Sequence, residues 1–348
     1  MGLERPSRLE FELREQGDVL AGRTGPGWPA ADAAARVLAG DDVDYLVIAA
    51  RGSSDNAARY AQYLLGSIAR LPIALAAPWL YSSHSPPRLR RGAVLAISQS
   101  GRSPDIAAVL AVARAQGRPT VAITNDVDSP LAAHADVIVP MLAGPEVSVA
   151  ATKTYLCSLH AIAQIAARLR PDLIRPAAFE RLPALVRQTV DQQLDRRDRF
   201  DRIDGATLVT VVGRGLQFPT AYETALKLRE LSGIPAEAFS PPDLLHGPIA
   251  ALGASGALWL VSSSGSEGAA GDWTGTIARD VGLTIVVSDD QRLVDDADIG
   301  VGIAADLQPW AAPMIAAIPG QAAALRLGEL RGVDLDRPHG LSKVTLTR

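Results

Sequence analysis

The sequence contains two copies of one pattern of apolar segments. Three pairs of segments match in the same order: GAVLAISQSG (92–101) with GALWLVSSSG (256–265), VAITND (121–126) with IVVSDD (285–290), and DYLVIAARGSS (44–54) with ATLVTVVGRGL (206–216). The first two pairs are 164 residues apart, and the third aligns Gly52 with Gly213, which are 161 residues apart. Three matches in one order predict two tandem copies of a single structural unit.

Each copy has the pattern of alternating strands and helices. Short runs rich in Val and Ile predict strands at 44–50, 92–98, 119–124 and 135–141, and segments rich in Ala, Leu and Arg predict helices at 56–70 and 104–117. Strands that are apolar throughout and separated by helices are typical of a parallel sheet covered on both faces. We therefore expect an α/β fold with two tandem doubly wound units, each built on a central parallel sheet.

The length of 348 residues, of which 48% are apolar, is sufficient for two domains with cores of their own. We expect five segments along the chain: a helical N-terminal lead-in at 1–40, a first domain at 41–172, a helical linker at 173–203, a second domain at 204–335 and a C-terminal tail at 336–348.

Composition argues against several classes of function. The net charge of −4 and the lack of a basic cluster with interleaved aromatics argue against nucleic acid. No signal peptide and no apolar run of membrane-spanning length is present, so we expect a cytoplasmic protein without a membrane partner. The single cysteine, Cys157, excludes an internal disulfide, and no metal-ligand spacing, P-loop or dinucleotide fingerprint occurs. We expect neither a metal nor an organic cofactor.

The segment SQSGRS at 98–103 follows an expected strand and precedes Pro104, which suits the first turn of a helix. Hydroxyl groups of Ser98, Ser100 and Ser103, together with the amide of Gln99, would then lie at a helix N-terminus, where the backbone favours an anion. A phosphate monoester fits this arrangement. An ordinary capped turn with surface serines explains the same residues, and this loop alone does not separate the two interpretations.

Two further loops carry polar groups after expected strands. In RGSSDN (51–56), a glycine permits close approach of a ligand and Ser54 offers a hydroxyl. In GPEVSVAATKTY (144–155), Glu146 precedes a run of small residues that could close over a ligand with backbone N–H groups. Lys153 fits either electrostatic support of a phosphate or a solvated position.

The second copy contributes residues that can transfer protons. Glu223, Lys227 and Glu230 share one face of an expected helix, where they are either functional or a solvated salt-bridge stripe. His246 lies in a loop bounded by Pro and Gly, and Lys343 lies in a tail that would ordinarily be at the surface. A phosphate cradle combined with a carboxylate, a histidine and an amine suits proton transfer at a carbonyl or amine carbon of a sugar phosphate.

These motifs together resemble the tandem SIS (sugar isomerase) domain family over residues 8–348. The resemblance rests on RGSSDN, SQSG, VAATK (149–153), ETALKLRE (223–230), LLHGP (244–248) and LSK (341–343). Within the family, the chain is most similar to the standalone glucosamine-6-phosphate deaminases and is related to the isomerase half of glutamine:fructose-6-phosphate amidotransferase. That synthase has an N-terminal glutaminase domain with a cysteine after its first methionine. This sequence starts MGLE, so we expect no release of ammonia from glutamine.

The resemblance implies a role for each matching residue. The phosphate would be held by Ser98, Gln99, Ser100 and Ser103, and the sugar hydroxyls by Ser54 and the backbone at Val149 and Ala151. Glu230 would move the proton between carbons 1 and 2, supported by Lys227 and Glu223. His246 would open the sugar ring from the neighbouring subunit of a homodimer, and Lys343 would contact the open-chain sugar, with or without forming an imine.

Two positions depart from the synthase pattern: Arg102 replaces an acidic residue and Ala151 replaces a serine. The activity implied is the conversion of glucosamine-6-phosphate and water to fructose-6-phosphate and ammonia. A related enzyme for another amino-sugar or ketoamine phosphate, and a SIS regulator that binds a sugar phosphate without turnover, remain alternatives.

Overall fold

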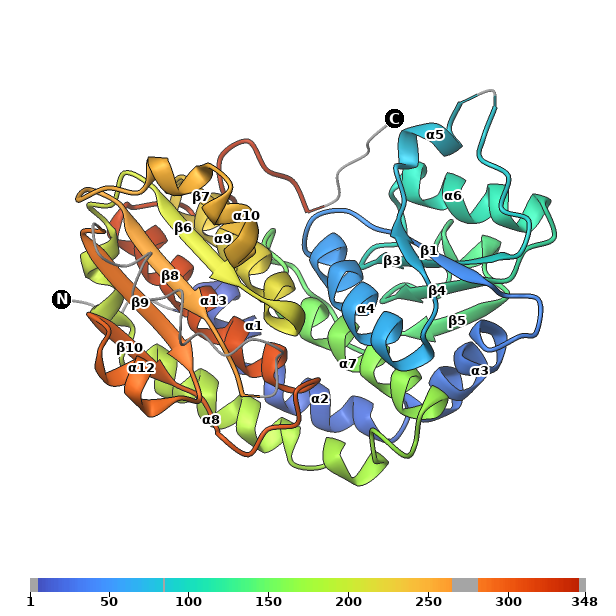
Figure 1. Cartoon of the computed structure of the whole chain (residues 1–348), viewed down its shortest axis with the longest axis horizontal. Coiled ribbons are helices and arrows are strands. Elements are labelled where there is room, and N and C mark those ends of the chain that lie inside the picture. Colours follow the sequence, from blue (N-terminus) through green and yellow to red (C-terminus); the bar gives the residue numbers. More distant parts are fainter. Residues whose placement is uncertain (1–5, 84, 265–280, 344–348) are drawn as a thin grey trace. The chain divides into compact units, whose positions relative to one another are not determined.

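The computed structural model describes residues 6–83, 85–264 and 281–343 (Figure 1). The described residues form two compact units. What we call the first unit lies within Gln16–Glu146, Lys153–Pro183 and Ser342–Arg348, and the second unit within Met1–Glu15, Val147–Thr152 and Ala184–Leu341. Each unit contains one five-stranded parallel sheet, which confirms the predicted fold class.

The sheet of the first unit has the strand order β2-β1-β3-β4-β5. Its strands are β1 (Tyr45–Ala49), β2 (Ile73–Leu75), β3 (Gly92–Ser98), β4 (Thr120–Thr124) and β5 (Val137–Pro140). Its helices are α2 (Gln16–Thr24), α3 (Trp28–Leu38), α4 (Ser53–Ala69), α5 (Pro78–Tyr81), α6 (Pro104–Ala115) and α7 (Lys153–Leu169), with short 3₁₀ turns at Ala132–His134 and Pro176–Phe179. The chain order reverses between β1 and β3, so the loops after these two strands meet at the topological switch point, where open α/β sheets bind ligands.

The second unit repeats this topology. Its sheet has the order β10-β9-β8-β6-β7, which is the first order read in the opposite direction. Its strands are β6 (Val209–Gly213), β7 (Ala236–Phe239), β8 (Ala257–Val261), β9 (Leu283–Ser288) and β10 (Ile299–Gly302). Its helices are α1 (Arg8–Arg14), most of α8 (Leu182–Asp195), α9 (Phe218–Ser232), α10 (Pro241–Leu245), α12 (Gln291–Asp295) and α13 (Ala312–Leu330), with 3₁₀ turns at Arg197–Ile203, Gly215–Gln217 and Pro248–Ala251. The predicted repeat is confirmed, because the matched segments form β1 and β6, β3 and β8, and β4 and β9; Gly265 of the second copy lies outside the described residues.

Each core forms where apolar strands meet apolar helix faces. All residues of β3 are buried, and Val94 and Ala96 belong to one cluster with Ile106 and Leu110 of α6. Helices α3 and α4 also pack against this sheet, and α7 packs against both of them (Figure 1). Burial of the Val, Leu and Ile side chains in these runs stabilises each unit by about 25 cal/mol per Å² of apolar surface removed from water.

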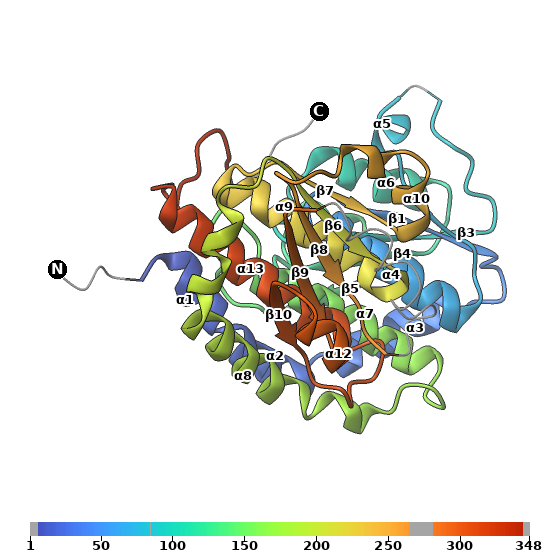
Figure 2. The same ribbon diagram turned by 60° about the vertical axis from the view of Figure 1, so that its left-hand side comes forward.

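Helix α9 packs closely against α13, as Figure 2 shows. A Cβ atom at Gly320 of α13 would lie 2.6 Å from Oγ1 of Thr224, and one at Gly328 would lie 2.5 Å from the carbonyl oxygen of Leu231. Because glycines stand at these two contacts, the helices approach more closely than larger side chains would permit. This packing fixes the position of α9, the helix that carries Glu223, Lys227 and Glu230.

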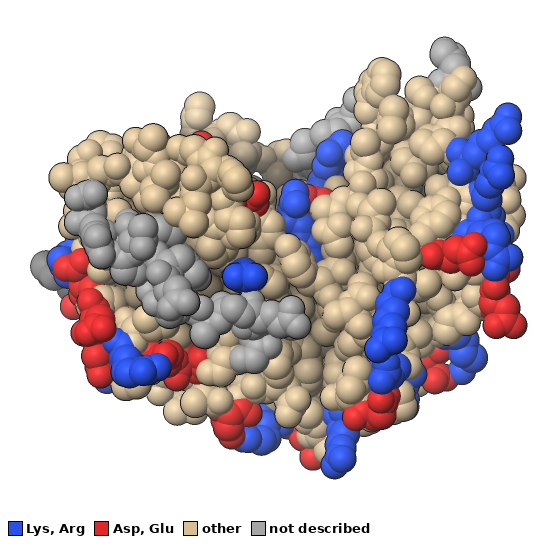
Figure 3. Space-filling model, viewed as in Figure 1, with Lys and Arg blue, Asp and Glu red and all other residues tan. Residues whose placement is uncertain are grey.

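The surface has mixed charge. On the face seen in Figure 3, Lys and Arg side chains are interspersed with Asp and Glu side chains, and the described residues there form no continuous basic surface. Among the described residues, no helix is long and apolar enough to cross a membrane.

Candidate functional site

The loop after β3 has the form of an anion cradle at the N-terminus of α6. Oγ of Ser98 accepts the N–H of Gly101 at 3.1 Å, and Oγ of Ser100 accepts the N–H of Arg102 at 3.3 Å. Each hydroxyl hydrogen therefore remains available for an outside acceptor. Ser103 is the N-cap of α6, as predicted, yet its side chain makes no capping hydrogen bond. The twelve-residue helix directs its positive end at this loop.

Asn125, at the end of β4, joins this cradle to the loop that leads to Glu146. Its N–H donates to the carbonyl oxygen of Gln99 at 3.1 Å, and its Nδ2 donates to the carbonyl oxygen of Gly144 at 2.8 Å. Its Oδ1 accepts the N–H of Ala143 at 3.0 Å. The backbone N–H and the side-chain amide of this one residue thus hold two loops in a fixed relation at the carboxyl edge of the sheet. The sequence analysis assigned Asn125 no role, although it belongs to one of the repeated segments.

The loop after β1 lies beside the cradle, because β1 and β3 are neighbours in the sheet. Gly52 has φ +58°, a backbone conformation that favours glycine, and α4 begins directly after it. Ser54 is therefore in the first turn of α4 and half-buried. Arg51 donates from Nε to Oδ2 of Asp105 in the first turn of α6 at 2.9 Å, which ties the two loops together. The fold thus brings Ser54 and the serines of the cradle to one edge of one sheet.

The corresponding loop of the second unit has a different environment. Residues 262–264 correspond to residues 98–100 in the repeat, at the spacing of 164. At the same spacing, Asp289 corresponds to Asn125 of the first unit. The N–H of Ser264 donates to both carboxylate oxygens of Asp289, at 2.8 and 2.9 Å. A carboxylate at this place repels an anion and occupies a backbone donor that a phosphate would need. The described part of the second copy therefore does not reproduce the cradle.

Helix α9 carries a group of buried charges. Nζ of Lys227 contacts Oε2 of Glu230 and lies 3.6 Å from Oε1 of Glu223. The side chains of Lys227 and Glu223 are each 1% exposed, while that of Glu230 is 23% exposed. The interpretation as a solvated salt-bridge stripe is therefore wrong. Glu230 is the member of the group that solvent or a ligand can reach. The other two charged side chains are buried and hold its carboxylate from below.

The segment 147–152 is attached to α1. The carboxylate of Glu12, a buried residue of that helix, accepts the N–H groups of Val147 and Ser148. The following residues Val149 and Ala151 are half-buried. Within the part of the chain that the structure describes, their N–H groups donate to no protein acceptor. Sequence reasoning did not find Glu12, because a lone Glu in an N-terminal helix gives no local signal of such a contact.

Lys343 makes an ion pair within the first unit. Its Nζ lies 2.7 Å from Oε2 of Glu146, whose side chain is 0% exposed. Thr154, in the first turn of α7, donates to the same carboxylate from its N–H at 3.0 Å and from its hydroxyl at 2.6 Å. Burial alone would raise the pKa of Glu146, but the charge and hydrogen bond of Lys343 and the bonds from Thr154 hold that pKa below its usual value. Lys343 is therefore not an ordinary surface lysine.

His246 follows the last residue of α10 and is exposed. Its N–H donates to the carbonyl oxygens of Pro242 and Asp243, which end the short helix. Lys153, for which the sequence left two interpretations, is 3% exposed, so it does not occupy a solvated position. Among the described residues, no group of three or more His, Cys, Asp or Glu side chains could hold a metal ion.

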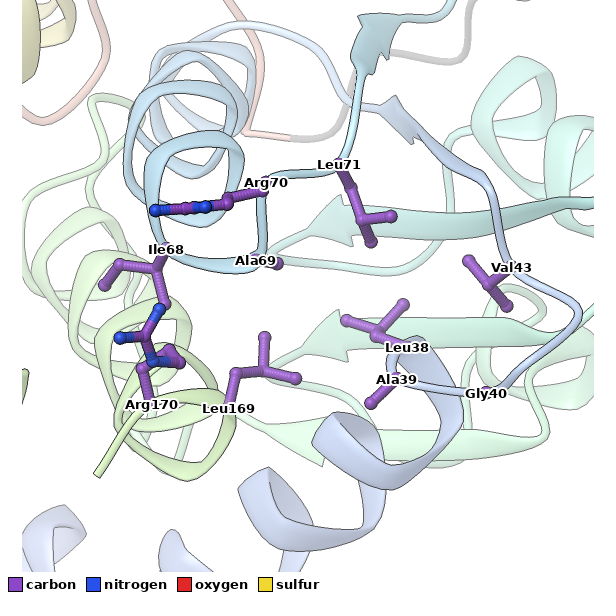
Figure 4. A pocket seen from close by; sticks show the side chains of 10 residues that line it. All are labelled: Leu38, Ala39, Gly40, Val43, Ile68, Ala69, Arg70, Leu71, Leu169 and Arg170. Atoms are coloured by element: carbon purple, nitrogen blue, oxygen red, sulfur yellow. The ribbon is translucent and has the colours of Figure 1, made fainter. Parts of the chain in front are cut away.

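A cavity of about 350 Å³ lies at the opposite edge of the first sheet (Figure 4). Its lining residues precede β1 and β2 or end α3, α4 and α7: Leu38, Ala39, Gly40, Val43, Ile68, Ala69, Arg70, Leu71, Leu169 and Arg170. The predicted cradle follows the carboxyl ends of the strands, so this cavity includes none of the predicted site residues.

Several known proteins share sequence or fold with this chain. Residues 42–168 match the family model described as the SIS domain. These residues form a SIS domain. The chain is 31% identical over 311 residues to glutamine--fructose-6-phosphate aminotransferase [isomerizing] of Zymomonas mobilis. The aligned segment covers 86% of this chain and 51% of that protein. The chain thus spans about half the length of the curated relatives it matches.

Two solved structures share the tandem SIS fold over nearly the whole chain. The C-terminal domain of glucosamine-fructose-6-phosphate aminotransferase from Francisella tularensis has a TM-score of 0.85 at 23% identity, covering 96% of this chain and 99% of that one. Glucosamine-6-phosphate deaminase from Thermotoga maritima has a TM-score of 0.80 at 19% identity, covering 98% and 100%. Both support two SIS units in this chain.

Proposed function

We propose that this protein converts glucosamine-6-phosphate and water into fructose-6-phosphate and ammonia. The observation that carries the proposal is the charge group on α9, in which Glu230 is the reachable end of an otherwise buried carboxylate–lysine–carboxylate arrangement. A carboxylate held in this way can accept a proton from one carbon and return it to the next.

The phosphate is bound by the first unit. Hydroxyl groups of Ser98, Ser100 and Ser103, the amide of Gln99 and the N-terminus of α6 together provide donors for its oxygens. Ser54 and the backbone N–H groups of Val149 and Ala151 bind the sugar hydroxyls. These contacts hold the reacting carbons of the sugar in place.

The chemical steps balance without a cofactor. After ring opening to the aldehyde, Glu230 removes the proton from carbon 2 while the aldehyde oxygen takes up a proton, which gives an enolamine with a double bond between carbons 1 and 2. Glu230 then returns its proton to carbon 1, and the amino group loses a proton that balances the one taken up by the oxygen, so an imine remains at carbon 2. Water adds to the imine carbon, and the C–N bond breaks as ammonia leaves, giving the ketose phosphate. Lys227 and Glu223 hold the Glu230 carboxylate in position.

Two residues complete the site. His246, which is exposed, opens the sugar ring in the site of a neighbouring subunit of a homodimer. Lys343 contacts the open-chain sugar. Mixing inactive Glu230→Gln protein with inactive His246→Ala protein should restore part of the activity after subunit exchange, and no recovery after proven exchange would place both residues in one subunit's site.

The test is ammonia release from a panel of amino-sugar phosphates and ketoamine phosphates, with unphosphorylated glucosamine as the control. We expect release from glucosamine-6-phosphate and its loss in Glu230→Gln. Release from a different member of the panel would change the substrate. Binding of glucosamine-6-phosphate with no ammonia and no deuterium exchange at carbons 1 and 2 would identify a regulator instead of an enzyme.

A further inference from the structure

Lysine is rare in this chain, and each lysine side chain is buried or mostly buried. The sequence has three lysines among its 34 basic residues: Lys153, Lys227 and Lys343. The first is 3% exposed, and the side chains of the other two are 1% and 21% exposed. The exposed positive charges of the described residues are arginines. A compact ammonium can release a proton, whereas a guanidinium stays charged, so a lysine can contribute chemistry that an arginine cannot.

The amine of Lys343 contacts the carboxylate of Glu146. Glu146 lies 197 residues earlier in the chain and is completely buried, and its donors include Nζ of Lys343 at 2.7 Å and both the N–H and the hydroxyl of Thr154. Removing a charge from water in this way is costly unless the partner remains in place. The carboxylate therefore stabilises the position in which the Lys343 amine contacts it.

The same carboxylate is held in a fixed relation to the cradle. The loop that ends at Glu146 is tied through Ala143 and Gly144 to Asn125, and Asn125 is tied to Gln99. All of these contacts lie within the first unit. A sugar phosphate bound by the cradle would consequently meet the amine of Lys343 at a place set by Glu146.

We infer that Glu146 is the positioning residue of Lys343 and holds its amine where it meets the sugar phosphate bound by the cradle. The inference rests on the proposed function, in which Lys343 contacts the open-chain sugar. The competing explanation is that Glu146 only caps the N-terminus of α7 through Thr154.

Glu146→Gln separates the two explanations, because glutamine keeps an acceptor for Thr154 and loses the charge that holds Lys343. We expect kcat to fall on the order of tenfold to a hundredfold, the effect of uncoupling residues in direct contact, with little change in KM because the cradle is intact. In a Lys343→Ala background the same substitution should cause no further loss. Wild-type kcat in Glu146→Gln, or losses that multiply in the double variant, would overturn the inference.

Glu10→Gln is the matched control. Glu10 is also a buried carboxylate that holds basic side chains, Arg14 and Arg197, but it belongs to the second unit and to no part of the proposed site. We expect this variant to lose thermal stability and to keep kcat. Loss of kcat equal to that of Glu146→Gln would show a general effect of removing a buried ion pair and would overturn the positioning role.

A second measurement needs no substrate and separates this inference from the proposed function. Acetic anhydride modifies amines that it can reach, and the Lys343 side chain is only 21% exposed while its amine contacts Glu146. Peptide mass spectrometry should show faster acetylation of Lys343 in Glu146→Gln than in the wild type, with an added lysine-containing peptide as the reference for the reagent. Equal rates would show that Glu146 does not hold the amine, whichever substrate the protein uses.

Discussion

Gly101 lies directly against Ser129 at the turn of the phosphate cradle. A Cβ atom at Gly101 would lie 2.0 Å from Oγ of Ser129 and 2.4 Å from its Cβ, and the backbone has φ +61°. Ser129 is itself buried, and its N–H donates to the carbonyl oxygen of Asp126. The turn that presents Ser98 and Ser100 is therefore possible only with glycine at position 101.

Gly101→Ala should accordingly disrupt both stability and substrate binding. The left-handed backbone costs a non-glycine residue about 1–2 kcal/mol, and the contact with Ser129 adds to this. Gly117 is the control: it has φ +66° with nothing within 4 Å of an added Cβ. We expect Gly117→Ala to lower the free energy of unfolding by the backbone cost alone and to leave KM unchanged. Urea unfolding and KM for glucosamine-6-phosphate measure the two effects, and equal behaviour of the variants would contradict the steric argument.

Ser100→Ala tests the cradle without changing its backbone. Loss of a hydrogen bond to a charged group costs about 1–3 kcal/mol, which should appear mainly as a higher KM for the phosphorylated substrate. Ser264 stands at the matching position of the second copy, where Asp289 accepts its N–H. We expect Ser264→Ala to leave KM unchanged. A variant of Ser264 with the larger effect would place the phosphate in the second unit.

Glu230→Gln tests the proton shuttle. The substitution keeps the size of the side chain and its position on α9 but removes its basicity. A positioned base contributes roughly 10²- to 10⁴-fold in rate, so kcat should fall by that factor while KM changes little. Glu237 on β7 is an exposed glutamate of the same unit, and Glu237→Gln should have wild-type kcat. Full activity in Glu230→Gln would exclude Glu230 as the base and direct attention to Glu223.

The sequence was sufficient for the architecture because the main strands are apolar along their whole length. The repeat also predicted that β1, β3 and β4 have partners in the second copy. β2 was not predicted: it has three residues, lies at the edge of the sheet, and follows Pro72. Helix α4 was predicted from residue 56 but begins at Ser53, because Gly52 changes the direction of the chain there.

The candidate site was predictable only where its residues are close in sequence. The serines of the cradle lie within one loop, so their number and the following proline were visible. The ion pair of Glu146 with Lys343 joins residues 197 apart and has no local pattern. The E-x-x-x-K spacing on α9 could not show burial, because that depends on α13 packing against α9. Tertiary contacts decided both cases.

The last prediction concerns a buried histidine outside the site. Nη1 of Arg23 lies 2.6 Å from Nδ1 of His160, and burial together with the positive charge of Arg23 lowers the pKa of His160 well below its usual value of 6.5. His160 is thus neutral in the folded protein, with Nδ1 as an acceptor. As pH falls below 6.5, the unfolded chain takes up a proton that the folded chain does not, so stability must decrease with falling pH until the lowered pKa is reached.

The slope of this decrease approaches about 1.4 kcal/mol for each pH unit from a single histidine. We expect urea unfolding of the wild type to show the loss between pH 6.5 and 5.5, above the range in which most carboxylates titrate. His160→Asn can still offer an acceptor to Arg23 but cannot take up the proton. Its stability should therefore fall less over the same interval, even if its stability at pH 7.5 is lower. Parallel curves for the two proteins would show that His160 is protonated equally in the folded and unfolded states, and that the Arg23 contact does not exclude the proton.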